Sequence, residues 1–125
     1  MRKIRSRFLP LFVALLCVGA VGARAETQYI NRNTAVVRIM NKAAGKTQTV
    51  NIPVGHATEF EKLDITVRAC RETPPFEMRD YFVFVEIGKR GALSPLVFSG
   101  WMVATEPGDN PLQDADYDLW LVRCE

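Results

Sequence analysis

The chain has 125 residues, of which 48% are hydrophobic and 24% are charged, a length and composition that fit one globular domain. Its formal charge is +2, but five of its 16 basic residues lie among the first 25 residues, where there is no acidic residue. The rest of the chain has 11 basic and 14 acidic residues, a net charge of −3. This balance argues against binding to nucleic acid, which needs a basic surface for the phosphates.

Residues 1–25 have the three parts of a secretory signal peptide. Four basic residues lie within residues 1–7, an apolar run follows over residues 8–22, and Ala23, Arg24 and Ala25 form a small-x-small cleavage site. The apolar run is shorter than the roughly 20 residues that a transmembrane helix needs. We therefore expect cleavage after Ala25. The mature domain, residues 26–125, would lie in the periplasm or outside the cell and have no transmembrane segment.

Cleavage would also change the cysteine count. Cys17 lies in the leader, so the mature chain keeps only Cys70 and Cys124. Disulfides persist in exported proteins because the compartment is oxidising. We therefore predict a disulfide between Cys70 and Cys124.

Six segments of the mature chain alternate apolar and polar residues with period two, which is typical of β-strands. Residues 81–87 are almost all aromatic or β-branched, so we expect this strand to be central and covered on both faces. No segment has the pattern of an amphipathic helix. The fold predicted is all-β, a small single-domain sandwich or barrel of about six strands. The predicted strands are residues 35–40, 46–52, 63–70, 81–87, 96–103 and 117–124.

Two connections are longer than a tight hairpin, residues 71–80 and residues 105–116. The first contains Pro74 and Pro75, which stiffen it, and two apolar side chains, Phe76 and Met78. One interpretation is that Phe76 folds back over an open end of the core. The other is that these four residues form a rigid finger that binds a partner, since functional residues often lie on loops. The second connection is expected to be a solvated acidic loop.

Few residues are available for catalysis by a nucleophile. The mature chain has one histidine, His56, and two serines, Ser94 and Ser99, without a G-x-S-x-G elbow. A Ser/His enzyme needs these groups within hydrogen-bond reach of each other and a third group that orients the base. We predict no catalytic residue, and we interpret His56 as a surface turn residue.

Three aspartates, Asp114, Asp116 and Asp118, have the spacing of the start of a calcium-binding loop. The sixth position of such a loop requires glycine for a sharp turn, and here it is Leu119. We therefore predict neither a metal site nor a cofactor.

Five aromatic residues lie at strand spacing: Phe82, Phe84, Phe98, Trp101 and Trp120. They could form an exposed platform for a sugar. In a domain with so small a core, however, such residues are more often buried, and we expect them to be core residues.

Two short motifs are the most specific in the chain, F-S-G-W-M at residues 98–102 and Y-D-L-W at residues 117–120. Together with residues 63–70, the Pro74-Pro75 step and Cys124, they resemble a family of small exported domains found mainly in alphaproteobacteria, domain of unknown function 2155 (DUF2155). The resemblance spans residues 35–124. It implies export, one domain and a disulfide, and it implies no particular activity. The motif residues are expected to be structural: Phe98, Gly100, Trp101, Tyr117, Asp118 and Trp120.

This chain departs from the family at one position. Members usually have His-Pro two residues before the Tyr-Asp, where this chain has Asp114 and Ala115. A metal-binding or acid–base role for that histidine therefore does not carry over.

These observations support three hypotheses for function. The first is a non-enzymatic periplasmic domain that binds an envelope protein or assists envelope assembly. The second is a binding module for an envelope glycan or a small molecule, which needs exposed aromatic residues beside polar ones. The third is a small hydrolase, which needs ionisable groups that converge in a cleft.

Overall fold

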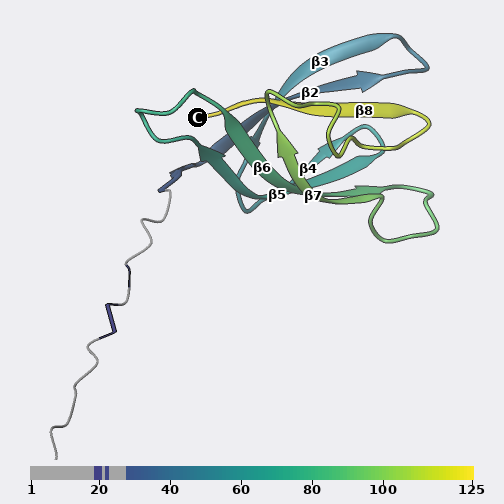
Figure 1. Ribbon diagram of the computed structural model, residues 1–125. Coiled ribbons are helices and arrows are strands. Elements are labelled where there is room, and N and C mark those ends of the chain that lie inside the picture. Colours follow the sequence, from purple (N-terminus) through teal and green to yellow (C-terminus); the bar gives the residue numbers. More distant parts are fainter. Residues whose placement is uncertain (1–18, 21, 23–27) are drawn as a thin grey trace, which may run out of the picture.

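The computed structural model describes residues 19, 20, 22 and 28–125, so the predicted signal peptide and its cleavage site lie almost entirely outside the described residues. Eight strands form two antiparallel sheets that pack face to face (Figure 1). The domain is therefore all-β, as expected, and it is a sandwich. The strands are β1 (Ile30–Arg32), β2 (Thr34–Asn41), β3 (Lys46–Pro53), β4 (Ala57–Phe60), β5 (Leu63–Glu72), β6 (Tyr81–Lys89), β7 (Phe98–Val103) and β8 (Tyr117–Cys124).

The larger sheet has the order β1-β5-β6-β7, and β4 also pairs with β5. The smaller sheet has the order β3-β2-β8. All six predicted strands are present, although β7 begins at Phe98 rather than at residue 96. The strands β1 and β4 were not predicted because they have only three and four residues, too few to show alternation. No helix long and apolar enough to cross a membrane is present in the part of the chain that the structure describes.

The core consists mainly of aliphatic side chains from the two facing surfaces of the sheets. Strand β6 shows the rule: Val83, Val85 and Ile87 are buried, whereas Phe82 and Phe84, which lie between them in sequence, are only half-buried. Alternate side chains of a strand point to opposite faces. Strand β6 is therefore central, between β5 and β7, but it is covered on one face only. The expectation that both of its faces are covered was wrong.

Of the five aromatic residues expected in the core, only Phe98 contacts it, so the expectation was wrong for the other four. Trp101 is 41% exposed, and Trp120, Phe82 and Phe84 are half-buried. Phe98 is partly buried and packs against the core. Aliphatic residues already fill most of the space between the sheets, so Phe82 and Phe84 of β6 and Trp101 of β7 face outward.

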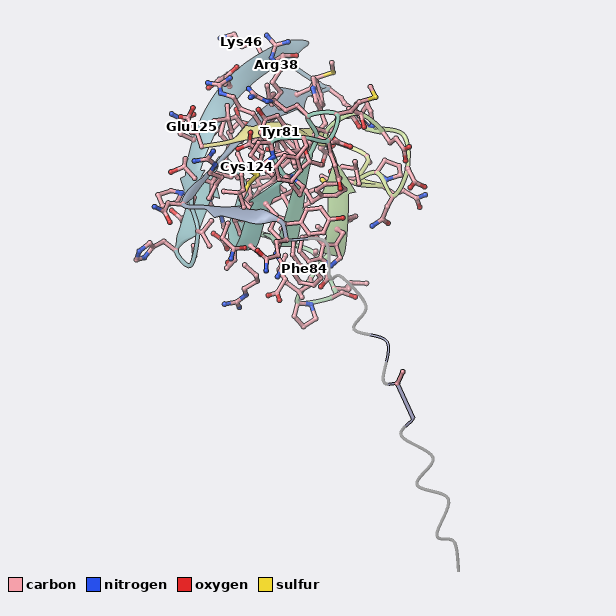
Figure 2. All side chains as sticks on the ribbon, turned by 60° about the vertical axis from the view of Figure 1, so that its left-hand side comes forward. Arg38, Lys46, Tyr81, Phe84, Cys124 and Glu125 are labelled. Atoms are coloured by element: carbon pink, nitrogen blue, oxygen red, sulfur yellow. A yellow bond between two sulfur atoms is a disulfide. The ribbon has the colours of Figure 1, made fainter. Side chains whose placement is uncertain are left out.

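A disulfide joins the two sheets. It links Cys70 of β5 to Cys124 of β8, whose Cα atoms are 5.7 Å apart, which confirms the predicted pairing. Figure 2 shows Cys124 between Phe84 on one side of the domain and Arg38 on the other. The crosslink therefore lies inside the sandwich and ties the central part of the larger sheet to an edge of the smaller one.

The connection between β7 and β8 is exposed at most positions, as expected of a solvated loop, but two contacts hold it to the sandwich. Leu112 is buried in the core. The side chain of Asn110 donates a hydrogen bond of 3.0 Å to the carbonyl of Trp101, and it lies against Gly100. A Cβ atom on Gly100 would come within 3.0 Å of the Asn110 amide nitrogen. Gly100 thus lets this loop lie along the edge of β7.

Removal of the disulfide should destabilise the domain. The two cysteines are 54 residues apart, and closing a loop of that length stabilises by about 4 kcal/mol in the chain-entropy model. We expect the double variant C70A/C124A to lose about 2–5 kcal/mol of unfolding free energy in urea. Wild-type protein kept in reductant serves as the control and should show a similar loss. An unchanged free energy in both samples would contradict the stabilising role of the crosslink.

Substitution of Gly100 by valine should release the loop after β7. The added side chain would displace Asn110 from its bond to the Trp101 carbonyl, at a cost of about 0.5–1.5 kcal/mol, which is typical of a lost hydrogen bond. The change is read by urea unfolding and by faster proteolysis within residues 105–116. Ser99→Val is the matched control, because Ser99 is exposed on the same strand. If both variants unfold at the same urea concentration, this explanation of Gly100 fails.

Candidate binding surface

The connection between β5 and β6, residues 73–80, forms a finger with a closed base. The backbone N–H of Thr73 donates to the carbonyl of Asp80 at 3.1 Å. The Thr73 hydroxyl donates to the carbonyl of Met78 at 3.0 Å and accepts from the backbone N–H of Asp80 at 2.9 Å. Pro74 is buried at this base and Pro75 is exposed beyond it. The finger is therefore an ordered hairpin connection that leads from one central strand to the next.

Further contacts hold the base of the finger to neighbouring elements. The carboxylate of Asp80 accepts from the hydroxyl of Thr105 at 2.7 Å. Glu72, which is buried, forms ion pairs with Arg32 at 2.8 Å and with Arg79 at 3.5 Å. These contacts connect the finger to β1 and to the residues after β7, so its base cannot move freely relative to the larger sheet.

The tip of the finger projects away from the core. The side chains of Phe76 and Met78 are each 93% exposed. The interpretation that Phe76 caps an open end of the core was therefore wrong. The structure leaves the other interpretation, in which these side chains are free to contact another molecule.

A second surface lies on the outer face of the larger sheet, and we call it the patch. Its residues come from neighbouring strands: Arg71 is opposite Phe82, and Phe84 is opposite Trp101. Tyr29 precedes β1 and packs edge-on against Phe82, with ring centroids 5.4 Å apart. Tyr29 and Trp101 are 42% and 41% exposed. The patch consists of Tyr29, Arg71, Phe82, Phe84 and Trp101.

The rings of the patch are tilted rather than flat. The planes of Phe84 and Trp101 meet at 73°, and those of Tyr29 and Phe82 meet at 68°. The guanidinium carbon of Arg71 lies 5.3 Å from the centroid of the Trp101 ring, a cation–π contact. A shallow hollow of about 150 Å³ opens between Tyr29, Arg71, Phe82 and Trp101. The patch thus combines exposed aromatic edges with one positive charge.

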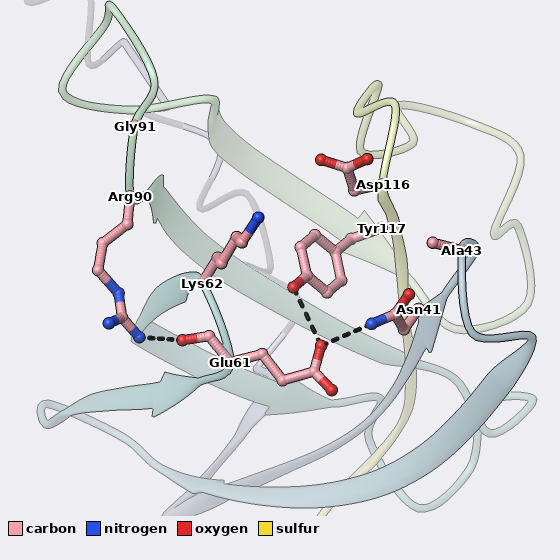
Figure 3. A pocket seen from close by; sticks show the side chains of 8 residues that line it. All are labelled: Asn41, Ala43, Glu61, Lys62, Arg90, Gly91, Asp116 and Tyr117. Atoms are coloured by element: carbon pink, nitrogen blue, oxygen red, sulfur yellow. Dashed lines mark hydrogen bonds between the residues drawn. The ribbon is translucent and has the colours of Figure 1, made fainter.

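A larger hollow of about 710 Å³ lies where the turn between β4 and β5 meets the smaller sheet (Figure 3). Glu61, whose φ is +51°, accepts hydrogen bonds from the Asn41 amide at 2.9 Å and from the Tyr117 hydroxyl at 3.0 Å. Arg90 donates to its carbonyl. Burial raises the pKa of Tyr117, and its bond to Glu61 adds to this effect. These contacts hold the turn between β4 and β5 against β2 and β8. Tyr117 therefore has a structural role, because its hydroxyl is one of the groups that hold Glu61.

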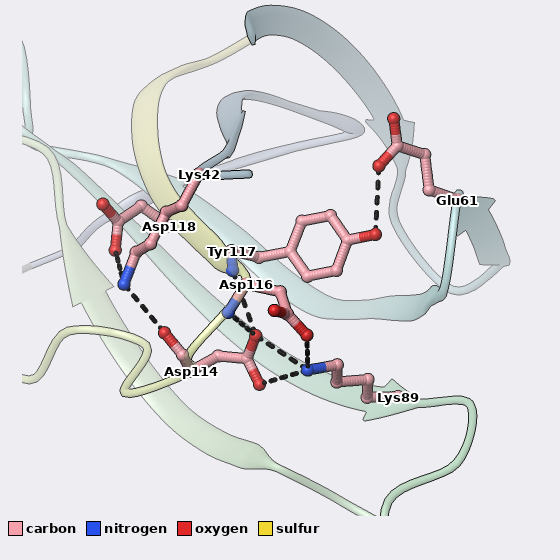
Figure 4. A network of polar contacts seen from close by, with 7 residues as sticks. All are labelled: Lys42, Glu61, Lys89, Asp114, Asp116, Tyr117 and Asp118. Atoms are coloured by element: carbon pink, nitrogen blue, oxygen red, sulfur yellow. Dashed lines mark hydrogen bonds and ion pairs between the residues drawn. The ribbon is translucent and has the colours of Figure 1, made fainter. Parts of the chain in front are cut away.

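The three aspartates near β8 are paired with lysines (Figure 4). The ammonium of Lys89 lies 3.0 Å from Asp114 and 2.6 Å from Asp116, and Lys42 lies 3.3 Å from Asp118. Hydrogen bonds to Asp116 and then to Asp114 raise the pKa of Lys89. Among the described residues, no group of three or more His, Cys, Asp or Glu side chains is arranged to hold a metal ion.

The pKa of Asp114 is lowered overall. Its burial alone would raise the pKa, but the backbone N–H groups of Asp116 and Tyr117 and the Lys89 ammonium outweigh this effect. Asp114 therefore caps the start of β8 in its ionised form. The carboxylate of Asp114 is thus part of a structural ion pair with Lys89.

Hydrolysis by a Ser/His pair gains no support from these contacts. His56 is exposed in the turn after β3, and no hydrogen bond joins it to Ser94 or Ser99 within residues 28–125.

Of the predicted site residues, the structure brings Pro74, Pro75, Phe76 and Met78 together in the finger. The sequence interpretation considered Phe82, Phe84 and Trp101 as an exposed platform but preferred a core role for them, and it did not include Tyr29 or Arg71. The signal for the patch is the alternation within residues 81–87, where valine and isoleucine at positions 83, 85 and 87 leave Phe82 and Phe84 on the other face. Arg71 and Trp101 belong to other strands, so only the pairing of the strands shows that they join the same surface.

The ion pair of Asp114 should make stability depend on pH. Because its pKa is lower in the folded than in the unfolded state, the carboxylate stabilises the fold above its ordinary value of 3.8, and this contribution is lost as the pH falls through the folded pKa. We expect Asp114→Asn to lower the urea midpoint at pH 7, and to approach wild type at a second, lower pH that lies below the folded pKa and therefore well below 3.8. Asp109→Asn, an exposed change in the same loop, is the control. An equal deficit of D114N at both pH values would contradict the ionic contribution.

Comparison with known proteins identifies a family but no characterised relative. No curated protein and no solved structure matches the chain. One family model matches residues 35–124, which include all of the strands except β1 and the first residue of β2. The family is described as an uncharacterized protein conserved in bacteria. This chain belongs to that family, DUF2155.

Proposed function

We propose that this protein is an exported, non-enzymatic domain that binds a protein partner of the cell envelope through the finger. One observation carries the proposal: Phe76 and Met78 are each 93% exposed on a connection whose base is closed by hydrogen bonds. The predicted signal peptide supports a partner outside the cytoplasm. The finger is the part of the domain best suited to make first contact with such a partner.

Two physical reasons favour a finger of this kind as a binding element. Large apolar side chains are unfavourable in water, and a partner that covers them removes this cost. The bonds of Thr73 and the rings of Pro74 and Pro75 also limit the conformations of the loop before binding. Less entropy is then lost when a partner immobilises it.

Binding of an envelope glycan is the second hypothesis, and the patch is the observation relevant to it. Exposed Trp101 and Tyr29 could contact a sugar. However, the ring planes are tilted by 68° and 73°, and Arg71 lies over the indole of Trp101. A sugar ring needs an open, flat aromatic face for stacking. The geometry therefore favours a protein partner over a glycan.

The proposal predicts that a photo-crosslinker at the exposed position Glu77 captures a discrete protein in the native cell envelope. The double variant F76A/M78A should abolish this adduct. It should change the unfolding free energy by no more than about 0.5 kcal/mol, as is usual for surface positions.

Leu93→Ala is the matched control. Leu93 is also fully exposed, and it lies on the connection between β6 and β7, at the opposite end of the sheet (Figure 1). This variant should leave the adduct intact. An adduct that persists in F76A/M78A, or that is lost equally in L93A, would overturn the proposal. A stability loss of several kcal/mol in the double variant would show that these residues pack in the fold, in the range expected for truncating a buried Phe.

A further inference from the structure

Arg71 differs from the other arginines near it. Arg68, three residues earlier on β5, pairs with Glu86 at 3.2 Å, and Arg32 and Arg79 both pair with Glu72. Arg71 is exposed, and no carboxylate of residues 28–125 forms an ion pair with it. Among these residues, the guanidinium group contacts the ring of Trp101. The patch therefore contains one positive charge that is still available to a ligand.

The contact with Trp101 prepares this charge for binding. The guanidinium carbon lies 5.3 Å from the centre of the Trp101 ring, and the side-chain N–H groups of Arg71 form no hydrogen bond with residues 28–125, so they stay available to a ligand. A carboxylate can accept two parallel N–H bonds from such a group. The surrounding rings of Phe82, Phe84 and Tyr29 exclude part of the water, which strengthens a charged hydrogen bond. The best ligand is thus a carboxylate with apolar atoms next to it.

The edge of β7 limits how such a ligand can lie. This edge is the natural place for an extended peptide to add as a further strand. The carbonyl of Trp101 is already occupied by the side chain of Asn110 at 3.0 Å. A ligand that binds across the face of the sheet through its side chains does not need this occupied carbonyl.

We propose that the patch is a second binding site, for an acidic peptide segment of a protein partner. In this site Arg71 holds the carboxylate of an Asp or Glu, and a neighbouring apolar side chain enters the hollow between Tyr29, Phe82 and Trp101. The proposal rests on the proposed function in that the partner is a protein. Arg71 is one residue before Glu72, where β5 ends, and Phe82 follows the first residue of β6. One partner can thus reach both the finger and the patch, because the finger joins these strand ends.

The probe for this site is the dipeptide N-acetyl-Phe-Glu-amide, compared with N-acetyl-Phe-Gln-amide, which lacks the carboxylate. Binding to the full mature chain is followed by NMR through the indole N–H signals of Trp101 and Trp120. We expect the acidic probe to shift the Trp101 signal in a saturable way and to leave Trp120 unmoved. The affinity should fall at least tenfold for the Gln probe.

The variant Arg71→Gln should weaken the acidic probe at least tenfold, to the level of the Gln probe. Arg38→Gln is the matched control, because Arg38 is exposed and lies opposite Trp120 on the other sheet. It should bind as the wild type does. An unmoved Trp101 signal, equal affinity for both probes, or equal weakening by R71Q and R38Q would overturn the proposal.

Two other occupants are tested in the same experiment. Tighter binding of glucuronate than of the acidic dipeptide would assign the patch to an acidic sugar instead. If Glu26→Gln alone shifts the Trp101 signal as much as a saturating amount of the acidic dipeptide does, the patch is occupied by the start of the mature chain. Either of these two results overturns the proposal. If the crosslinked adduct at the finger is lost while the acidic dipeptide still binds the patch, the proposed function fails and the patch proposal stands. Peptide binding that fails while the adduct persists refutes the patch alone.

Discussion

The aliphatic filling between the two sheets is the constraint on which the rest of the structure depends. In β6, Val83, Val85 and Ile87 point inward, and the pleat of the strand then directs Phe82 and Phe84 outward. A shift of one residue in the pairing would exchange these faces and bring rings into a space sized for valine and isoleucine. The composition of the core thus decides that the aromatic residues are available at the surface.

The two surfaces that follow from this arrangement depend on the same pair of central strands. Strands β5 and β6 carry Arg71, Phe82 and Phe84 on their outer face, and the finger connects their ends. On the inner side, the bond from Cys70 to Cys124 fixes β5 to the smaller sheet. A rigid pair of strands can therefore present exposed apolar side chains at a defined position, which is a common basis for binding by loops and sheet faces.

Local patterns in the sequence were sufficient for most of the fold. Alternation located six strands, and the two cysteines that follow the predicted signal peptide gave the disulfide pairing. The strands β1 and β4 are too short to carry such a pattern, and their pairing with β5 depends on their position along its edge. The bond between Asn110 and the Trp101 carbonyl, and the ion pair of Lys89 with Asp114, also join residues whose proximity arises only from the fold.

The candidate site was predictable in part for the same reason. The exposed finger is visible as Pro74, Pro75, Phe76 and Met78 in one connection, although its sequence is equally compatible with a cap on the core. For Phe82 and Phe84, the burial of Val83 and Val85 determines the outcome. The core is already filled, so the two rings lie on the outer face. Arg71 and Trp101 are 30 positions apart, and only the order β5-β6-β7 places one near the other.

The most direct measurement of an open, positively charged aromatic face is collisional quenching of Trp101 fluorescence in a W120F variant. Iodide is an anion and caesium is a cation. The positive charge of Arg71 should therefore raise the local concentration of iodide near Trp101 and lower that of caesium. We predict strong quenching by iodide, weaker quenching by caesium, and loss of this difference when Arg71→Gln is added. Weak quenching by both ions, or an iodide preference that R71Q does not alter, would contradict the arrangement of Trp101 and Arg71 on the outer face.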